Sequence, residues 1–251
     1  EAPMLYIGEI VGSNSNYELD IAVDPLEGTN FTAKNLPNAI SVMAVTNKGG
    51  MLSAPDTYME KIAIGSGYPK NIIDLDNSVE KNINSIANAK KTEVKNLTAC
   101  VLERPRHEKI IKSLKDLNVK IKFIKDGDVM GVISVVDSNS PVDIYIGTGG
   151  GPEGVLAAAA LDCLGGQMQT RLVLSDDKEI NRAKKLGIKD LKKKYNINDM
   201  IKGDVIFIAT GVTDGEFLKG IKIKGNSFEA ESFVLHKSQN LSKKIKNLIK
   251  E

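Results

Sequence analysis

The stretch LTACVLERPRHEKIIKSLKDLNVKIKFI, residues 97–124, decides the fold class. It opens with a short apolar run typical of a buried strand, Leu97–Leu102, and closes with a second such run, Val119–Ile124. Between them, Arg106–Leu117 places isoleucines and leucines on one face of a helix. Strands that alternate with helices are the sequence mark of an α/β protein built in layers.

The alternation continues beyond residue 124 and is looser before residue 97. Val129–Val136 is predicted as a helix, Val142–Ile146 as a strand and Pro152–Cys163 as a helix. Further strands are expected at Leu19–Asp24, Ala39–Val45, Asp204–Thr210, Gly220–Lys224 and Glu229–Leu235, and further helices at Asp76–Ala89, Asp176–Tyr195 and, as an amphipathic basic tail, Ser238–Glu251. A soft boundary near Lys90–Asn96 separates a strand-rich part, residues 1–95, from an alternating part, residues 96–251, unless the two form one continuous domain.

Composition excludes several classes of protein. Among 251 residues, 34 basic and 32 acidic side chains leave a net charge of +2, which argues against a nucleic-acid binder. No apolar run approaches the ~20 residues that cross a membrane. Two cysteines, Cys100 and Cys163, fit a reducing, cytoplasmic compartment. Because His107 and His236 are the only histidines, any metal must be held mainly by carboxylates, which favours magnesium or manganese.

The hexapeptide Asp24-Pro25-Leu26-Glu27-Gly28-Thr29 is the sharpest local signal. It predicts that a buried strand ends at Asp24 and is followed by a turn. Two carboxylates, Asp24 and Glu27, repel each other unless a cation lies between them, so the spacing indicates a divalent metal site. Gly28 lets the backbone approach a ligand, and Thr29 offers a hydroxyl and an N–H to a phosphate oxygen or a water. The alternative is a solvated turn.

A second signal is the scarcity of arginine. The chain has four arginines among its 34 basic residues: Arg104, Arg106, Arg171 and Arg182. Two of them flank Pro105, at a predicted strand-to-helix junction whose free N–H groups favour anions. Arginine binds phosphate through two parallel hydrogen bonds, which lysine cannot do. The alternative is a helix start with an exposed ion pair to Glu103 or Glu108.

A third signal follows the strand predicted at Val142–Ile146. Gly149–Gly154 satisfies the pattern G-x-G-x-x-G, so a dinucleotide loop has to be considered. Glu153 would repel a pyrophosphate at this helix start, whereas it could bind a metal beside a sugar or phosphate. A purely structural glycine turn is the remaining interpretation.

Two weaker signals remain open. Asp126-Gly127-Asp128 follows a predicted strand, where an acid could accept hydrogen bonds from sugar hydroxyls, or Asp128 could cap the next helix. The segment Pro55–Lys61 contains Tyr58, and by itself it favours a plain turn.

Together these segments resemble one known family, the class II fructose-1,6-bisphosphatases, or GlpX family. The motifs that carry the resemblance span the chain in the family's order: EAPMLYIGE (1–9), VDPLEGT (23–29), APDTYMEK (54–61), RPRH (104–107), DGDV (126–129), GGGPEG (149–154) and ATGVTDG (209–215). The resemblance implies a layered α-β-α-β-α sandwich shared with the lithium-sensitive sugar and inositol phosphatases. It also implies removal of the 1-phosphate from fructose 1,6-bisphosphate in gluconeogenesis, with Mn²⁺ or Mg²⁺ as cofactor.

The resemblance also assigns roles to residues. Asp24, Glu27 and Glu153 match metal-binding acids, and Thr29 matches the threonine that orients the attacking water, so Thr29, Asp24 and Glu27 are the expected catalytic residues. The positions that match substrate contacts are Glu27, Gly28, Thr29, Tyr58, Arg104, Pro105, Arg106, Asp126, Gly127, Asp128 and Gly150. The expected partner is a small sugar bisphosphate, with no nucleic acid and no membrane, and the expected assembly is a homodimer or homotetramer.

Family members carry several dozen residues before the position of Glu1, including further acidic ligands and a lysine. We therefore expect a chain that begins at Glu1 to have an incomplete metal site. Competing substrates are sedoheptulose 1,7-bisphosphate and inositol phosphates, and a dinucleotide-binding protein is the alternative from another class.

Overall fold

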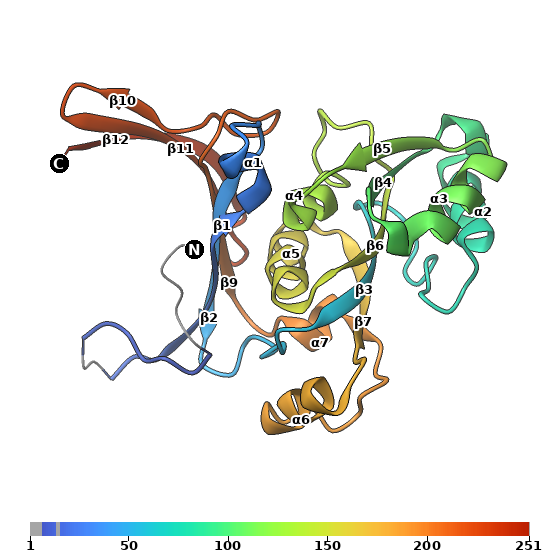
Figure 1. Ribbon diagram of the computed structural model, residues 1–251, viewed down its shortest axis with the longest axis horizontal. Coiled ribbons are helices and arrows are strands. Elements are labelled where there is room, and N and C mark those ends of the chain that lie inside the picture. Colours follow the sequence, from blue (N-terminus) through green and yellow to red (C-terminus); the bar gives the residue numbers. More distant parts are fainter. Residues whose placement is uncertain (1–6, 14–15, 251) are drawn as a thin grey trace. The chain divides into compact units, whose positions relative to one another are not determined.

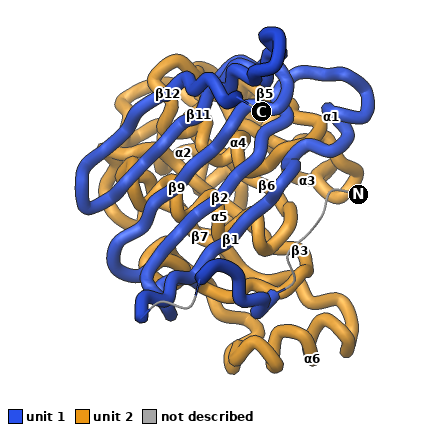
Figure 2. The backbone as a smooth tube through the Cα atoms, turned by 90° about the vertical axis from the view of Figure 1, so that its left-hand side faces the viewer, with its two compact units in different colours: residues 1–51, 202–251 blue, residues 52–201 orange. Residues whose placement is uncertain are grey.

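The computed structural model describes residues 7–13 and 16–250, which fall into two compact units (Figure 2). Unit 1 comprises Glu1–Met51 and Lys202–Glu251, and unit 2 comprises Leu52–Ile201. The boundary that the sequence suggests near Lys90–Asn96 falls inside unit 2, between a helix and a strand. Most of the first motif of the resemblance, residues 1–6, lies outside the described residues.

Unit 1 is built on one antiparallel sheet. Its strand order is β1-β2-β9-β11-β10, and β12 pairs with β11. The strands are β1 (Leu19–Glu27), β2 (Ile40–Asn47), β9 (Val205–Gly211), β10 (Lys222–Lys224), β11 (Ser227–His236) and β12 (Leu241–Lys250), and one short helix, α1, covers Thr29–Ala33. Buried and half-buried residues alternate along β2 and β9, as expected for strands with one face in a core. Five strands of this sheet confirm the prediction from sequence.

The basic tail is the clearest error of prediction. The sequence suggested a helix over Ser238–Glu251, but Leu241–Lys250 is strand β12, paired with the whole length of β11. A tight turn with Asn240 at φ 48° brings the tail back along β11, whose edge offers a complete ladder of backbone partners. The apolar residues Leu241, Ile245 and Ile249 share one face of a strand as readily as one side of a helix. Pairing with β11 therefore decided between a helix and a strand.

Unit 2 is built on a mixed sheet in the order β5-β4-β6-β3-β7-β8, in which β4 pairs in parallel with β5 and β6. Its strands are β3 (Tyr58–Ile64), β4 (Thr98–Leu102), β5 (Lys120–Ile124), β6 (Ile144–Gly150), β7 (Gln167–Val173) and β8 (Tyr195–Asn196). Its helices are α2 (Val79–Lys90), α3 (Glu108–Asp116), α4 (Asp128–Ile133), α5 (Gly151–Leu164), α6 (Asp177–Lys185) and α7 (Ile197–Met200), with 3-10 turns η1 (Val94–Asn96) and η2 (Pro105–His107). The decisive stretch, residues 97–124, forms β4, η2, α3 and β5, as predicted.

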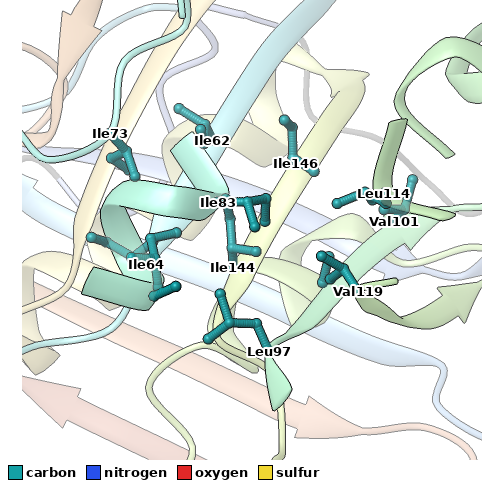
Figure 3. Packing of buried hydrophobic residues seen from close by; sticks show 13 residues of the cluster. Ile62, Ile64, Ile73, Ile83, Leu97, Val101, Leu114, Val119, Ile144 and Ile146 are labelled. Carbon is teal, nitrogen blue, oxygen red and sulfur yellow. The ribbon is translucent and has the colours of Figure 1, made fainter. Parts of the chain in front are cut away.

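Helices cover both faces of the unit 2 sheet: α2 and α3 lie on one face, and α4 and α5 on the other (Figure 1). On the α2–α3 face, Ile83 of α2 and Leu114 of α3 pack with strand residues such as Ile144 in a fully buried cluster (Figure 3). No helix among the described residues has the length and apolar character needed to cross a membrane. Each unit thus contains a sheet, and the chain as a whole is a mixed α/β protein.

Two central strands of unit 2, β3 and β7, were not predicted from the sequence. The segment that favoured a plain turn, Pro55–Lys61, instead leads into β3, and β7 had no predicted counterpart. Lys61 lies buried in β3, and its charge interrupts the apolar pattern by which a central strand is recognised. The helix predicted over Asp176–Tyr195 is also too long, because α6 ends at Lys185 and the chain turns at Gly187 with φ 82°.

Candidate active site

The glycine turn between β6 and α5 forms the centre of the candidate site in unit 2. Strand β6 ends at Gly150 and α5 begins at Gly151, with Pro152 and Glu153 in its first turn. The N–H of Gly151 donates to the carbonyl of Thr57, 2.7 Å away, which ties this junction to the residue before β3. A Cβ on Gly150 would lie 1.9 Å from Oε2 of Glu153. The Glu153 carboxylate therefore lies directly over Gly150, and only glycine leaves it that space.

A buried ion pair supports this turn from beneath. Lys61, 1% exposed, pairs with Asp128, 6% exposed, which is the first residue of α4. A Cβ on Gly149 would lie 1.8 Å from Oδ2 of Asp128 and 3.2 Å from Nζ of Lys61. The ion pair thus fills the space that the missing side chain of Gly149 leaves open.

The cap role considered for Asp128 is wrong. The residue before α4 is Gly127, with φ 75° in the left-handed region, and no side chain caps this helix. Asp128 lies one position later, where its carboxylate turns to Lys61 instead of the helix N–H groups. A buried lysine needs a charged partner, and Asp128 supplies it.

The two arginines of the RPRH segment contact residues next to this turn and next to Asp128. The Nε and Nη2 atoms of Arg106 both donate to the carbonyl of Thr148 in β6, at 2.9 and 2.8 Å. The guanidinium of Arg106 also lies over the ring of Tyr58, 4.7 Å from its centroid. Nη2 of Arg104 lies 3.6 Å from Oδ1 of Asp126. Arg104 is thus paired with Asp126, a partner that differs from the Glu103 or Glu108 considered from sequence.

His107 belongs to this cluster, and it was not among the site residues predicted from the sequence. Its ring is 1% exposed, with Nδ1 2.7 Å from the carbonyl of Leu102 and Nε2 2.7 Å from the N–H of Thr148. Burial lowers the pKa of His107, and the charges of Arg106 and Arg104 lower it further, while the hydrogen bond to Leu102 acts in the opposite direction. The one signal in the sequence is its place directly after the two arginines.

The carboxylate hexapeptide lies in unit 1, at the end of β1. The strand does not end at Asp24 as predicted; it runs on to Glu27 with a register shift between them. Two residues of β1 there, Pro25 and Leu26, oppose one residue of β2, which is the count of a β-bulge, and this irregularity on an edge strand accommodates Pro25. Oδ1 of Asp24 accepts a hydrogen bond from the N–H of Leu26 at 3.0 Å.

The hexapeptide then turns at Gly28, which has φ 83° and precedes α1. Glu27 is buried, with 5% exposure, whereas Thr29 at the start of α1 is exposed. The expected catalytic residues therefore follow one another within six positions of one unit, although the strand that carries them is only partly buried.

The sequence-predicted residues thus divide between the units. Unit 2 brings together Tyr58, Arg104, Pro105, Arg106, Asp126, Gly127, Asp128, Gly150 and Glu153, and unit 1 holds Asp24, Glu27, Gly28 and Thr29. Within residues 7–13 and 16–250, no three histidine, cysteine or acidic side chains gather into one metal-binding group. The donors that the three acids offer are carboxylate oxygens, which fit Mg²⁺ or Mn²⁺ in chemistry.

Comparison with known proteins gives a consistent result. Residues 1–249 match the family described as bacterial fructose-1,6-bisphosphatase, glpX-encoded. A fructose-1,6-bisphosphatase class 2 of Haemophilus influenzae is 41% identical over 262 aligned positions, which cover 99% of this chain and 78% of that protein. The fructose-1,6-bisphosphatase 1 class 2 of Escherichia coli K12 is 40% identical over 99% of this chain and 77% of its own length, and a class 2 enzyme of Shigella flexneri gives the same values.

Proposed function

This chain belongs to the family of bacterial glpX-encoded fructose-1,6-bisphosphatases, and from that premise we propose how its residues hydrolyse fructose 1,6-bisphosphate to fructose 6-phosphate and phosphate. Family membership makes it a phosphoric monoester hydrolase. The finer proposals are that the fold is the layered α-β-α-β-α sandwich of the lithium-sensitive phosphatases and that the enzyme serves gluconeogenesis in the cytoplasm. The observation that supports the substrate class best is the fixed position of Arg106 between Thr148 and Tyr58.

Arg104 and Arg106 are proposed to bind the phosphate that is not cleaved. A guanidinium carries five N–H donors, and Arg106 uses two of them, one on Nε and one on Nη2, in hydrogen bonds to the carbonyl of Thr148. Three donors remain on a side chain that is already oriented, so little freedom is lost when a phosphate binds. Such binding energy orients the sugar for reaction at its other phosphate.

Asp24, Glu27 and Glu153 are proposed to hold the divalent cation, Mn²⁺ or Mg²⁺. When bound, such an ion polarises phosphoryl oxygens and lowers the pKa of a coordinated water. Thr29, exposed at the start of α1, is proposed to orient the attacking water through its hydroxyl. Uncatalysed hydrolysis of phosphate monoesters is among the slowest reactions in biology, so exact orientation and charge stabilisation both contribute to the rate.

A pair of variants tests these roles. Glu153→Gln keeps the shape of the side chain but removes its charge, so kcat should fall by roughly 100-fold or more, as for other groups that stabilise transition-state charge. Arg106→Lys should raise KM by about 10-fold or more, because it loses two charge-assisted hydrogen bonds, and should change kcat little. Arg182→Lys, on the exposed helix α6, is the matched control. Normal kcat in Glu153→Gln would contradict the metal assignment.

Substrate range is a separate measurement. The arginine pair favours substrates with a second phosphate, so we expect phosphate release from fructose 1,6-bisphosphate and from sedoheptulose 1,7-bisphosphate, and little from sugar or inositol monophosphates. Equal rates on monophosphates would contradict the role of Arg104 and Arg106. Glu153 in the first turn of α5 disfavours a pyrophosphate there, so no dinucleotide binding is expected.

A further inference from the structure

Two consecutive side chains hold both backbone groups of Thr148. Strands β4 and β6 pair only at Ala99–Ile144 and Cys100–Tyr145, and beyond that point the RPRH turn lies beside β6 in place of a strand. His107 accepts the N–H of Thr148, and Arg106 donates twice to the carbonyl of Thr148. The turn is therefore fixed to β6 at one residue, by one neutral and one charged side chain.

The partners of the His107 ring leave it one protonation state. The carbonyl of Leu102 can only accept, so Nδ1 must carry a proton. The N–H of Thr148 can only donate, so Nε2 must carry none. His107 is therefore neutral, with its proton on Nδ1, and a proton on Nε2 would face a second donor.

Close packing fixes the ring as well. A Cβ on Gly147 would lie 3.2 Å from both Cε1 and Nε2 of His107, so the ring lies against the bare backbone of β6. A side chain at position 147 would have to push the ring away from Thr148. This contact accounts for a glycine that lies outside the GGGPEG motif.

We propose that neutral His107 is a positioning residue for substrate binding: by holding the N–H of Thr148, it fixes the carbonyl to which Arg106 is bound and so presents Arg106 to a phosphate group. The inference rests on the proposed function, because it takes Arg106 as a phosphate ligand. His107 itself, 1% exposed, acts only through the backbone of Thr148. Its effect should therefore be on substrate affinity.

The kinetic test is a double-mutant cycle of His107→Phe and Arg106→Lys. Phenylalanine keeps a ring of similar size but makes neither hydrogen bond, so KM for fructose 1,6-bisphosphate should rise about 10-fold, the scale of one or two lost hydrogen bonds, while kcat changes by less than about 3-fold. His107→Asn, which can form one of the two bonds, should give an intermediate KM. In the Arg106→Lys background, His107→Phe should add little, because both variants act on the same phosphate contact.

The control is His236→Phe in unit 1, the same substitution at the other histidine of the chain, which should leave KM unchanged. A folded His107→Phe enzyme with normal KM would overturn the proposal. Fully multiplicative effects in the double variant would overturn it as well, since they would mean that His107 acts independently of Arg106.

A spectroscopic test needs neither activity nor a folded His107 variant. Long-range ¹⁵N–¹H correlation of the chain should show two histidines, which the His236→Phe variant assigns. At pH 7, His107 should show a protonated Nδ1 and an unprotonated Nε2. The opposite tautomer, or a charged ring, would refute the hydrogen-bond scheme even if the enzyme is active, whereas the expected tautomer in a chain without phosphatase activity would overturn the proposed function alone.

Discussion

The two units hold their polar groups in different ways. Among the described residues, the buried polar or charged side chains of unit 2 are Thr57, Lys61, Asn82, Thr98, His107, Asp128, Asp143 and Thr170, and those of unit 1 are Glu27 and Thr46. Ion pairs of unit 1 such as Lys48–Glu18 and Lys224–Glu229 lie at the surface. A buried polar group needs a fixed partner, so the candidate site residues of unit 2 lie among side chains that cannot move independently. Unit 1 instead shapes its carboxylate turn by a β-bulge and one left-handed glycine.

The two histidines show the same difference. His107 in unit 2 is enclosed by backbone groups and two arginines, whereas Nε2 of His236 in unit 1 lies 2.8 Å from Oδ2 of Asp204 near the surface. Ser238 also contacts both of these side chains. The three do not form a catalytic triad, because Ser238 and Asp204 both contact Nε2 of His236. In a triad, the serine and the aspartate contact different nitrogens of the histidine ring. In unit 1 the polar cluster fastens the β11–β12 turn to β9.

The largest effect is expected from Lys61→Met. Removing one member of a buried ion pair leaves the Asp128 carboxylate uncompensated, which costs about 3–5 kcal/mol in the free energy of unfolding. Urea denaturation measures it. Adding Asp128→Asn should recover part of the loss, while Lys48→Met, at an exposed pair of unit 1, should leave the midpoint unchanged. Equal midpoints for the two lysine variants would remove the contrast between the units.

Two glycines extend the comparison to the candidate site residues of each unit. Gly149→Ala places a methyl group 1.8 Å from the Asp128 carboxylate, and overpacking of this kind costs about 1–3 kcal/mol. Gly28→Ala forces a side chain into the left-handed region, at a cost of about 1–2 kcal/mol, and meets the Phe31 ring at 2.8 Å.

Gly187→Ala isolates the conformational part of that cost, since the described neighbours leave open space there at φ 82°. Thermal denaturation of the three variants should therefore rank Gly149 above Gly28 and Gly28 above Gly187. A harmless Gly149→Ala would mean that the Lys61–Asp128 pair is not confined beneath the turn.

The smallest expected effects are those of pH on stability, and His107 and Asp204 act in different pH ranges. The pKa of His107 lies below its ordinary 6.5 in the folded state, so the unfolded chain binds more protons and stability falls as the pH drops below about 6.5, until the folded pKa is passed. For Asp204, burial acts to raise the pKa, but hydrogen bonds from Ser238 and His236 outweigh it and lower the pKa to about 2. Its contribution is present above about pH 4 and is lost as the pH falls towards 2.

Urea midpoints between pH 7 and pH 2 measure both effects. His107→Phe should flatten the profile between pH 7 and pH 5, and Asp204→Asn should flatten it below pH 4. A profile in which the two variants change the same range would contradict the assignment of one histidine to a buried cluster and of the acid to a surface cluster.

Part of the candidate site can be predicted from the sequence alone. The glycine turn with Glu153, the arginine pair around Pro105 and the carboxylates of the hexapeptide all carry local signals in residue type and spacing. Lys61 carries no such signal and His107 only its place after the arginines, because their roles come from partners 67 and 41 residues away in the chain. Asp128 was predicted as a site residue, but its partner Lys61 was not, so a helix cap stayed open as an alternative to a sugar contact.

The elements of the fold also differ in whether the sequence alone predicts them. Residues 97–124 form strand, helix and strand as predicted, because two short apolar runs flank a segment whose apolar residues recur at helical spacing. Strand β3 and strand β12 depended on the tertiary structure. A buried lysine is tolerated in β3 only because Asp128 is there to meet it, and an apolar stripe in a basic tail becomes a strand only because β11 offers its edge. The sequence alone determines an element when residues of that element supply its pattern and its partners. The tertiary structure decides when the required partner lies far away in the chain.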